Sequence, residues 1–204
     1  ARAREDDAPH LIHMPERPFD RDVFLSAVQD IHRRHGFVSI VCGEGIKQAD
    51  GTPVSASRTT DRFANVEYGA MGGTSVAVNL HRMIADAFGW RGEFQVTESL
   101  PMSAFDRAVE LDIEEAYECG RRAVDLASEG TGGVMVALVR EPGGGYKCTT
   151  GTAPLADVAV RAKPMPDAFI NEAGNFPTEA FLDYLRPLVG ELPAFSRLTM
   201  RPAR

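Results

Sequence analysis

The sequence has little cysteine, no long apolar run and no excess of basic residues. Its 204 residues include only three cysteines, Cys42, Cys119 and Cys148, which are odd in number and widely spaced. That pattern argues against a disulfide framework and fits a reduced, cytosolic protein. No apolar stretch approaches the ~18 residues that a membrane-spanning helix needs. Lys and Arg number 22 against 29 Asp and Glu, giving a net charge of −7, so nucleic acid and anionic membranes are not expected partners.

Several kinds of site and signal are also missing. The five histidines do not form a metal-binding set, and we find no Ser/His/Asp set, zinc motif or close pair of catalytic carboxylates. The opening residues lack the pattern of a signal peptide, so none is expected. The first residue, Ala1, is not methionine, and the charged opening residues resemble a helix already under way. We therefore expect a cytoplasmic protein without a metal site of its own, present here as a fragment.

Strand-like and helix-like segments alternate along the chain. The strands are expected at residues 10–14, 37–42, 93–97 and 134–139. The helices are expected at residues 20–35, 75–88, 112–129, 155–162 and 178–185. Residues 143–145 are glycines that predict a hairpin turn, with residues 146–150 returning. This order predicts an α/β fold: a mostly parallel, doubly wound sheet with helices on both faces and a C-terminal hairpin.

One carboxylate lies where such a sheet binds ligands. The β-branched run at residues 37–42 predicts a strand buried on both faces, and Glu44 follows it between Gly43 and Gly45. Ligands of open α/β sheets bind outside the carboxyl ends of the strands, and glycines let a ligand approach the backbone. Glu44 is therefore a candidate acceptor of hydrogen bonds from a polyol. The alternative is that it caps the loop or pairs with Lys47.

A glycine-rich turn precedes the helix expected at residues 75–88. It contains Gly72 and Gly73, and backbone N–H groups at a helix start suit anion binding. The turn is neither a Walker loop nor a Gly-x-Gly-x-x-Gly fingerprint. A tight packing turn is the alternative, and the pattern alone favours it.

Polar residues also flank the third expected strand. Glu98 and Ser99 follow it and should share a rim with Glu44, where a serine can bond a ligand hydroxyl. Arg91 precedes the strand and Arg107 comes after it, and an arginine fork matches phosphate oxygens. The alternative is that the loop only leads into the next helix and that the arginines are solvated surface charge.

Six segments, taken in chain order, resemble the C-terminal half of phosphofructokinases, closest to the pyrophosphate-dependent branch. Three are the Gly-Glu-Gly strand end at residues 41–46, the Met-Gly-Gly helix start at 69–73 and the Asp-x-x-x-Ala-x-x-x-Gly-x-x-Ala-Val helix at 112–124. The others lie at residues 13–19, 155–159 and 185–191. The match covers nearly the whole chain, and six segments in the right order are specific.

The resemblance implies transfer of a phosphoryl group from pyrophosphate or ATP to the 1-hydroxyl of fructose 6-phosphate, with Mg²⁺. It implies that residues 1–204 are one sugar-phosphate-binding domain, in which residues 154–204 are a partly extended wrapping segment. The donor, the metal and the Asp that acts as base belong to an N-terminal domain outside this sequence. No catalytic residue is therefore expected here, and the fragment alone is expected to be inactive.

The resemblance also gives roles to single residues. Glu44 falls on the family's sugar-binding Glu, with Glu98 and Ser99 close by. Arg91 lies near the place where an Arg reaches the sugar 6-phosphate of a neighbouring subunit, which implies a homo-oligomer. The family carries His or Tyr and then, three residues on, Arg after the third strand, whereas an ungapped count places Ser99 and Met102 there.

Met102 keeps other interpretations open, because a methionine cannot bind phosphate. Arg107 can take that role only if the loop is rearranged. The first alternative is a non-catalytic regulatory or pseudo-enzyme subunit that binds a phosphorylated metabolite. The second is an unrelated doubly wound domain with a flavodoxin-like strand order.

Overall fold

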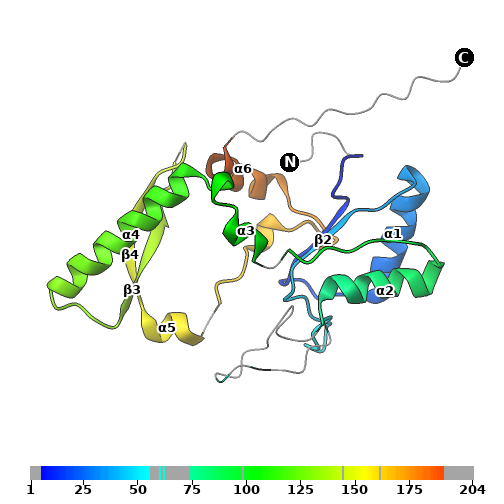
Figure 1. Cartoon of the computed structure of the whole chain (residues 1–204), viewed down its shortest axis with the longest axis horizontal. Coiled ribbons are helices and arrows are strands. Elements are labelled where there is room, and N and C mark those ends of the chain that lie inside the picture. Colours follow the sequence, from blue (N-terminus) through cyan, green and yellow to red (C-terminus); the bar gives the residue numbers. More distant parts are fainter. Residues whose placement is uncertain are drawn as a thin grey trace, which may run out of the picture. The chain divides into compact units, whose positions relative to one another are not determined.

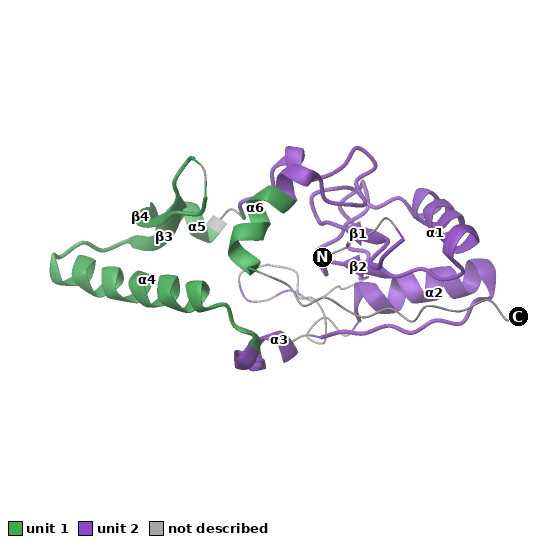
Figure 2. Cartoon of the chain, turned by 90° about the horizontal axis from the view of Figure 1, so that it is seen from above, with its two compact units in different colours: residues 1, 107–162, 182–204 green, residues 2–106, 163–181 purple. Residues whose placement is uncertain are grey.

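The computed structural model describes residues 6–55, 60, 62, 74–97, 99–143, 145–160 and 162–190. The chain divides into two compact units, drawn in different colours in Figure 2. We call residues 2–106 and 163–181 the parallel unit, and residues 1, 107–162 and 182–204 the hairpin unit. Each unit is described by itself.

The parallel unit contains a small parallel sheet and two helices. Strand β1 (Leu11–His13) pairs in parallel with β2 (Ile40–Cys42), with Leu11 opposite Ile40 and His13 opposite Cys42. Helices α1 (Arg21–His35) and α2 (Val76–Phe88) follow the two strands in chain order (Figure 1). A short helix α3 (Leu100–Ser103) and a 3₁₀ turn at Asp167–Phe169 complete it.

The ends of the two long helices confirm the sequence prediction. The Asp20 side chain accepts hydrogen bonds from the backbone N–H of Asp22 and Val23, both at 2.9 Å, and so caps α1. Gly36 and Gly89 end α1 and α2 with positive φ angles of 77° and 66°, a conformation that glycine adopts without strain.

The core of the parallel unit lies among both helices and one face of the sheet. Phe24 and Val28 of α1 are 1% and 0% exposed, and Val76 of α2 is fully buried. The buried members of the core are Leu11, Phe19, Phe24, Leu25, Val28, Ile31, Ile46, Val54, Val76 and Leu80. Val38, Ile40 and Cys42 pack against this cluster from the second strand and its approach.

The α/β class is confirmed, but the sheet is smaller than expected. Within the described residues the strands form two separate two-stranded sheets, one parallel and one antiparallel. The strand expected at residues 37–42 shrinks to Ile40–Cys42, and its burial on both faces was a wrong prediction, since Val41 is 49% exposed. Residues 93–97 form no strand. A strand needs a partner edge, and this segment makes no backbone ladder with β2.

The hairpin unit contains the expected hairpin. Strands β3 (Val134–Arg140) and β4 (Cys148–Pro154) pair antiparallel, from Val134 opposite Pro154 to Arg140 opposite Cys148. Helices α4 (Glu110–Ser128), α5 (Leu155–Val160) and α6 (Glu179–Val189) accompany it, and α6 begins in the parallel unit. A 3₁₀ turn at Phe105–Arg107 precedes α4.

Two helix boundaries differ from the prediction. Helix α4 begins at Glu110 after Val109 and has no side-chain cap, so Asp112 lies within the first turn instead of at the cap. A negative charge there complements the helix dipole. Helix α6 runs through Pro187 instead of ending before it. Proline at this position removes the hydrogen bond that an N–H would donate to the Asp183 carbonyl, and its ring crowds that carbonyl, so it weakens the last turn without ending the helix.

None of the helices in the described part of the chain combines the length and apolarity needed to cross a membrane.

Candidate functional site

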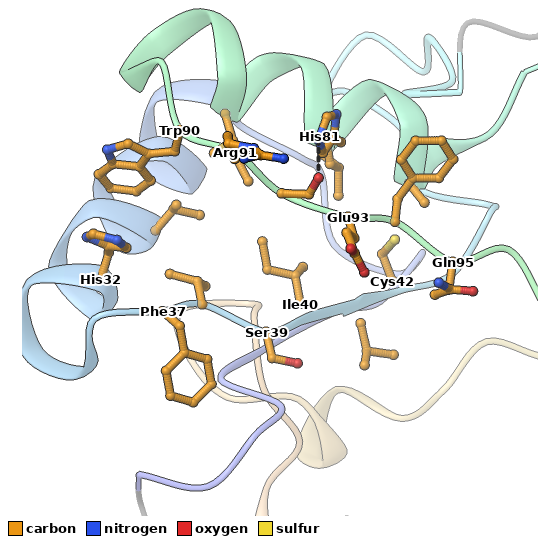
Figure 3. A pocket seen from close by; sticks show the side chains of 18 of the residues that line it. His32, Phe37, Ser39, Ile40, Cys42, His81, Trp90, Arg91, Glu93 and Gln95 are labelled. Carbon is orange, nitrogen blue, oxygen red and sulfur yellow. Dashed lines mark hydrogen bonds between the residues drawn. The ribbon is translucent and has the colours of Figure 1, made fainter.

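The parallel unit has a cavity of about 750 Å³, open to solvent on one side, beside strand β2. One wall is formed by residues 36–42 and Glu44, and another by helix α2 with residues 90–97. Figure 3 shows Ser39, Ile40 and Cys42 on the strand side, and His81 and Arg91 on the helix side. The walls are largely apolar, with a few polar groups among them, as in most small-molecule sites.

Glu44 lies in this cavity and also holds the start of helix α2. Its Oε2 atom accepts a hydrogen bond from the Val76 backbone N–H at 3.1 Å. A carboxylate at a helix N-terminus is stabilised by the helix dipole and the unpaired N–H groups there. Glu44 thus caps the start of α2, a contact that the sequence analysis did not predict, and no ion pair with Lys47 forms among the described residues.

The aromatic end of the cavity comes from α1 and the residues after α2. The Trp90 ring stacks on His32 at 3.9 Å and on Phe88 at 4.4 Å between ring centroids. Figure 3 shows Trp90 and His32 together at one end of the cavity, near Phe37. Such flat rings can cover an apolar face of a bound ligand.

His81 fixes the segment that forms the other wall. Its Nε2 atom lies 3.1 Å from the Gly92 carbonyl oxygen, and its ring contacts that of Phe94 at 5.6 Å. A Cβ atom at Gly92 would lie 3.2 Å from the His81 ring, so glycine allows this close approach. The segment is thus tied to helix α2 and not to strand β2.

The Cys42 thiol in the cavity wall is poorly reactive. Burial, and secondarily the negative charge of Glu44, raise the pKa of Cys42 to about 11. The thiolate is the nucleophilic form, and little of it exists at neutral pH when the pKa is so high. Cys42 therefore contributes packing to this site, and no covalent chemistry follows from its position.

The described residues contain no group of three or more His, Cys, Asp or Glu side chains placed to hold a metal ion. A Mg²⁺ ion needs oxygen ligands in near-octahedral geometry. The acidic side chains described here do not gather into such a group.

The structure brings two of the predicted site residues together. Glu44 and Arg91 line the same cavity. Ser99 precedes α3, where its backbone oxygen accepts from the Met102 N–H at 3.0 Å, and it does not line the cavity. Met102 is 86% exposed on α3. Arg107 belongs to the hairpin unit and is exposed.

Three predicted residues cannot be placed. Glu98, Gly72 and Gly73 lie outside the described residues.

Sequence reasoning missed the ring-bearing lining residues His32, His81 and Trp90. Each occupies a position that looks ordinary in the sequence: the last turn of one helix, the middle of another, and the residue after a helix-ending glycine. The only signal available was the single tryptophan, which stands directly before the candidate Arg91. Their convergence depends on how α1 and α2 pack, which no local pattern encodes.

The chain is similar over most of its length to enzymes of one kind. It is 37% identical over 185 residues to the pyrophosphate–fructose 6-phosphate 1-phosphotransferase of Halomonas elongata, covering 91% of this chain and 43% of that protein. It is 37% identical over 179 residues to the enzyme of the same name from Methylococcus capsulatus, covering 88% and 41%. The corresponding Rhodospirillum rubrum enzyme is 34% identical over 198 residues, covering 91% and 46%. No protein-family model matches the chain.

Solved structures give the same result. A pyrophosphate-dependent phosphofructokinase from Nitrosospira multiformis aligns with a TM-score of 0.67 and 29% identity, covering 91% of this chain and 42% of that one. One from Marinobacter aquaeolei aligns with a TM-score of 0.71 and 28% identity, covering 99% and 49%. The chain spans less than half the length of each of these proteins. The resemblance inferred from the six segments is confirmed.

Proposed function

We propose that this chain is the sugar-phosphate-binding part of a phosphofructokinase-type enzyme. The reaction is transfer of a phosphoryl group to the 1-hydroxyl of fructose 6-phosphate. The observation that carries the proposal is identity of 34–37% over 88–92% of the chain with proteins named for that reaction. Their names favour pyrophosphate over ATP as the donor.

We infer that donor binding and acceptor binding belong to different domains of the whole enzyme. Enzymes that transfer phosphoryl groups mostly position the reactants and neutralise charge. The resemblance puts the donor, Mg²⁺ and the base in an upstream domain, and the described residues of this chain have no acidic cluster for a metal. We infer that this chain supplies the acceptor side as one domain of a cytoplasmic enzyme, and that it is inactive alone.

We assign Glu44 to the hydroxyls of the sugar phosphate bound by this chain, and Arg91 to the 6-phosphate of the sugar bound by a neighbouring subunit. An ionised carboxylate only accepts hydrogen bonds, and with Oε2 bonded to Val76 the Glu44 side chain still has acceptor sites for a sugar hydroxyl. The Arg91 guanidinium, in the same cavity, matches a phosphate by two parallel N–H···O bonds. The resemblance makes that phosphate the neighbouring subunit's, so a homo-oligomer is part of the proposal. Glu98, Ser99, Arg107 and the turn at Gly72 and Gly73 stay candidates for further contacts.

Calorimetric titration with fructose 6-phosphate tests the assignment. Glu44→Gln keeps an acceptor for the Val76 N–H but removes the charge, whereas Glu114→Gln makes the same change on the exposed side of α4. A hydrogen bond to a charged group contributes about 1.5–3 kcal/mol, so we expect Glu44→Gln to weaken binding by about tenfold or more. Glu114→Gln should bind like the unaltered chain. Equal affinities for both variants would refute the role of Glu44.

A second candidate function is favoured by Met102. This exposed side chain occupies the place where the resemblance implies an Arg that contacts the sugar phosphate. A non-catalytic subunit that binds a phosphorylated metabolite would tolerate that change. A coupled assay of the intact protein with pyrophosphate, and then with ATP, separates the two functions. Binding of fructose 6-phosphate without turnover with either donor selects the non-catalytic subunit.

A further inference from the structure

The three cysteines of the chain divide into one isolated thiol and one pair. Cys42 belongs to the parallel unit, whereas Cys119 and Cys148 belong to the hairpin unit, on helix α4 and at the start of strand β4. Both thiols of this pair are free and half-buried, so a small reagent can reach them. They can react with each other only if α4 and β4 bring them to the same place.

Cys119 lies on the side of α4 that faces the hairpin. Helix α4 lies along the two strands in both views (Figure 1 and Figure 2). All residues of the helix are exposed except five at helical spacing, which therefore form its covered side: Leu111, Glu115, Cys119, Arg122 and Leu126. Like other helical side chains, Cys119 leans back toward the preceding turn, which carries Glu115.

Cys148 lies beside the group that Glu115 contacts. The Tyr146 hydroxyl donates a hydrogen bond of 2.7 Å to Glu115 Oε1. This bond, then desolvation and then contact with the Cys148 thiol raise the pKa of Tyr146. Alternate residues of an extended chain point to the same side, so Tyr146 and Cys148 both face α4.

The distances along the helix and along the strand also match. Helix α4 and strand β4 run in the same direction, because the chain reverses between α4 and β3 and again between β3 and β4. From Glu115 to Cys119 the helix rises by about 6 Å. From Tyr146 to Cys148 an extended chain advances by about 6.6 Å. Since Glu115 and Tyr146 are in contact, Cys119 is level with Cys148.

We propose that Cys119 and Cys148 form a reversible disulfide that clamps helix α4 onto the hairpin. A disulfide joins Cα atoms roughly 4.4–6.8 Å apart, which is less than extended Glu and Tyr side chains span together. Closing the bond therefore draws α4 toward β4. This redox switch goes beyond the proposed function and does not depend on it. A reducing compartment keeps such a pair as thiols, and oxidising conditions close it.

The oxidant is a small disulfide such as oxidised glutathione. One protein thiolate attacks a sulfur of that disulfide, forms a mixed disulfide and releases one glutathione. The second protein thiolate attacks the protein sulfur of the mixed disulfide, forms the Cys119–Cys148 bond and releases the other glutathione. The two protein thiols are oxidised, one glutathione disulfide is reduced, and both protons end on the released glutathione thiols.

A matched pair of cysteine positions tests the geometry. In a Cys42→Ser background only Cys119 and Cys148 remain. The control adds Cys119→Ser and Gly120→Cys, which moves the helix cysteine by one residue to an exposed position with open space around it. The loop between the two cysteines then has nearly the same length, so chance closure is equally easy in both chains.

Both chains are incubated with oxidised glutathione, and peptide mapping by mass spectrometry measures the intramolecular disulfide. We expect the yield with Cys119 to exceed that of the Gly120→Cys control by about tenfold or more, because a disulfide tolerates little error in geometry. Equal yields would overturn the proposal. If Cys42→Ser fails to fold, the unaltered chain decides. Predominance of the Cys119–Cys148 pairing supports the proposal, and the same mixture of three pairings with and without urea overturns it.

Hydrogen exchange tests whether the disulfide acts as a clamp. Oxidation should slow exchange of the α4 amides by about tenfold or more and leave the α1 amides unchanged, because the bond restrains local opening of α4 alone. Reduction with dithiothreitol should restore the original rates. A disulfide that forms without slowing the α4 amides would overturn the clamp.

Discussion

The two units use their helices in opposite ways. In the parallel unit, α1 buries four apolar side chains, Phe24, Leu25, Val28 and Ile31. In the hairpin unit, α4 is the longer helix, with 19 residues, yet Leu126 is its only buried residue. Its apolar stripe is exposed, with Ile113, Tyr117 and Val124 at 43%, 69% and 66%. An amphipathic pattern thus defines a face that can be buried, and only a partner surface decides whether it is.

In the hairpin unit, polar contacts connect helix α4, the hairpin and helix α6. The side of α4 that is partly covered carries Glu115, which accepts a hydrogen bond of 2.7 Å from the Tyr146 hydroxyl. This bond, with smaller contributions from desolvation and Cys148, raises the pKa of Tyr146. The Arg140 guanidinium lies over the rings of Tyr146 and Tyr184, at 5.1 and 4.6 Å from their centroids. Exposed contacts of this kind contribute far less than a buried core.

The largest expected difference between the two units is in the free energy of unfolding after one aromatic side chain in each unit is truncated. Phe24→Ala removes a ring from the core and should lower the free energy of unfolding by about 3–5 kcal/mol. Tyr117→Ala removes an exposed ring and should change it by less than about 0.5 kcal/mol. Urea unfolding can be followed by Trp90 fluorescence for the parallel unit and by circular dichroism for the helices.

The same two variants can also contradict the difference in helix burial between the units. A loss for Tyr117→Ala close to that for Phe24→Ala would show that the α4 stripe is covered in solution. The contrast between the units would then describe the isolated chain and not the assembled protein.

The structural elements that the sequence predicted well are those formed by interactions between neighbouring residues. Asp20 caps α1 through N–H groups two and three residues away, and Gly36 ends it through its own φ angle. The hairpin of β3 and β4 follows from a glycine-containing turn between two strands that are consecutive in the chain. Each of these depends on a handful of neighbouring residues, so a single sequence contains the necessary information.

The features that sequence missed depend on distant partners. Residues 93–97 have the composition of a strand, but pairing needs the edge of β2, about fifty positions earlier in the chain. Glu44 was recognised as a candidate from its neighbours, whereas its bond to Val76 spans 32 residues. The exposure of Val41 likewise reflects the lack of a covering layer, which periodicity cannot reveal.

Helix caps give a second, smaller contrast between the units. Asp20→Ala removes two hydrogen bonds from the start of α1 and should cost about 1 kcal/mol. Helix α4 begins after Val109 without a side-chain cap, so Val109→Asp should supply one and stabilise the hairpin unit by up to about 1 kcal/mol. Thermal unfolding measured by circular dichroism checks both. No gain from Val109→Asp would mean that the first N–H groups of α4 already have partners.

The smallest expected contrast depends on pH, because all five histidines of the chain belong to the parallel unit. The His13 ring lies edge-on between Phe19 and Phe24, with centroid distances of 5.8 and 5.4 Å. Its Nε2 atom is buried and has no hydrogen-bond partner among the described residues. Burial disfavours the charged ring and lowers the pKa of His13 in the folded state.

The sign of the effect follows from where the proton binds. An unfolded chain, in which the pKa of His13 is about 6.5, takes up the proton at higher pH than the folded one. The free energy of unfolding should therefore fall as the pH drops below about 6.5 and be unaffected by this group above it. His13→Gln, which cannot titrate, should lose less stability than the unaltered chain between pH 7.5 and 5.5, as measured by urea unfolding with Trp90 fluorescence. Equal losses in both proteins would assign the acid sensitivity to other groups, and a similar loss in the hairpin unit, which has no histidine, would assign it to the carboxylates.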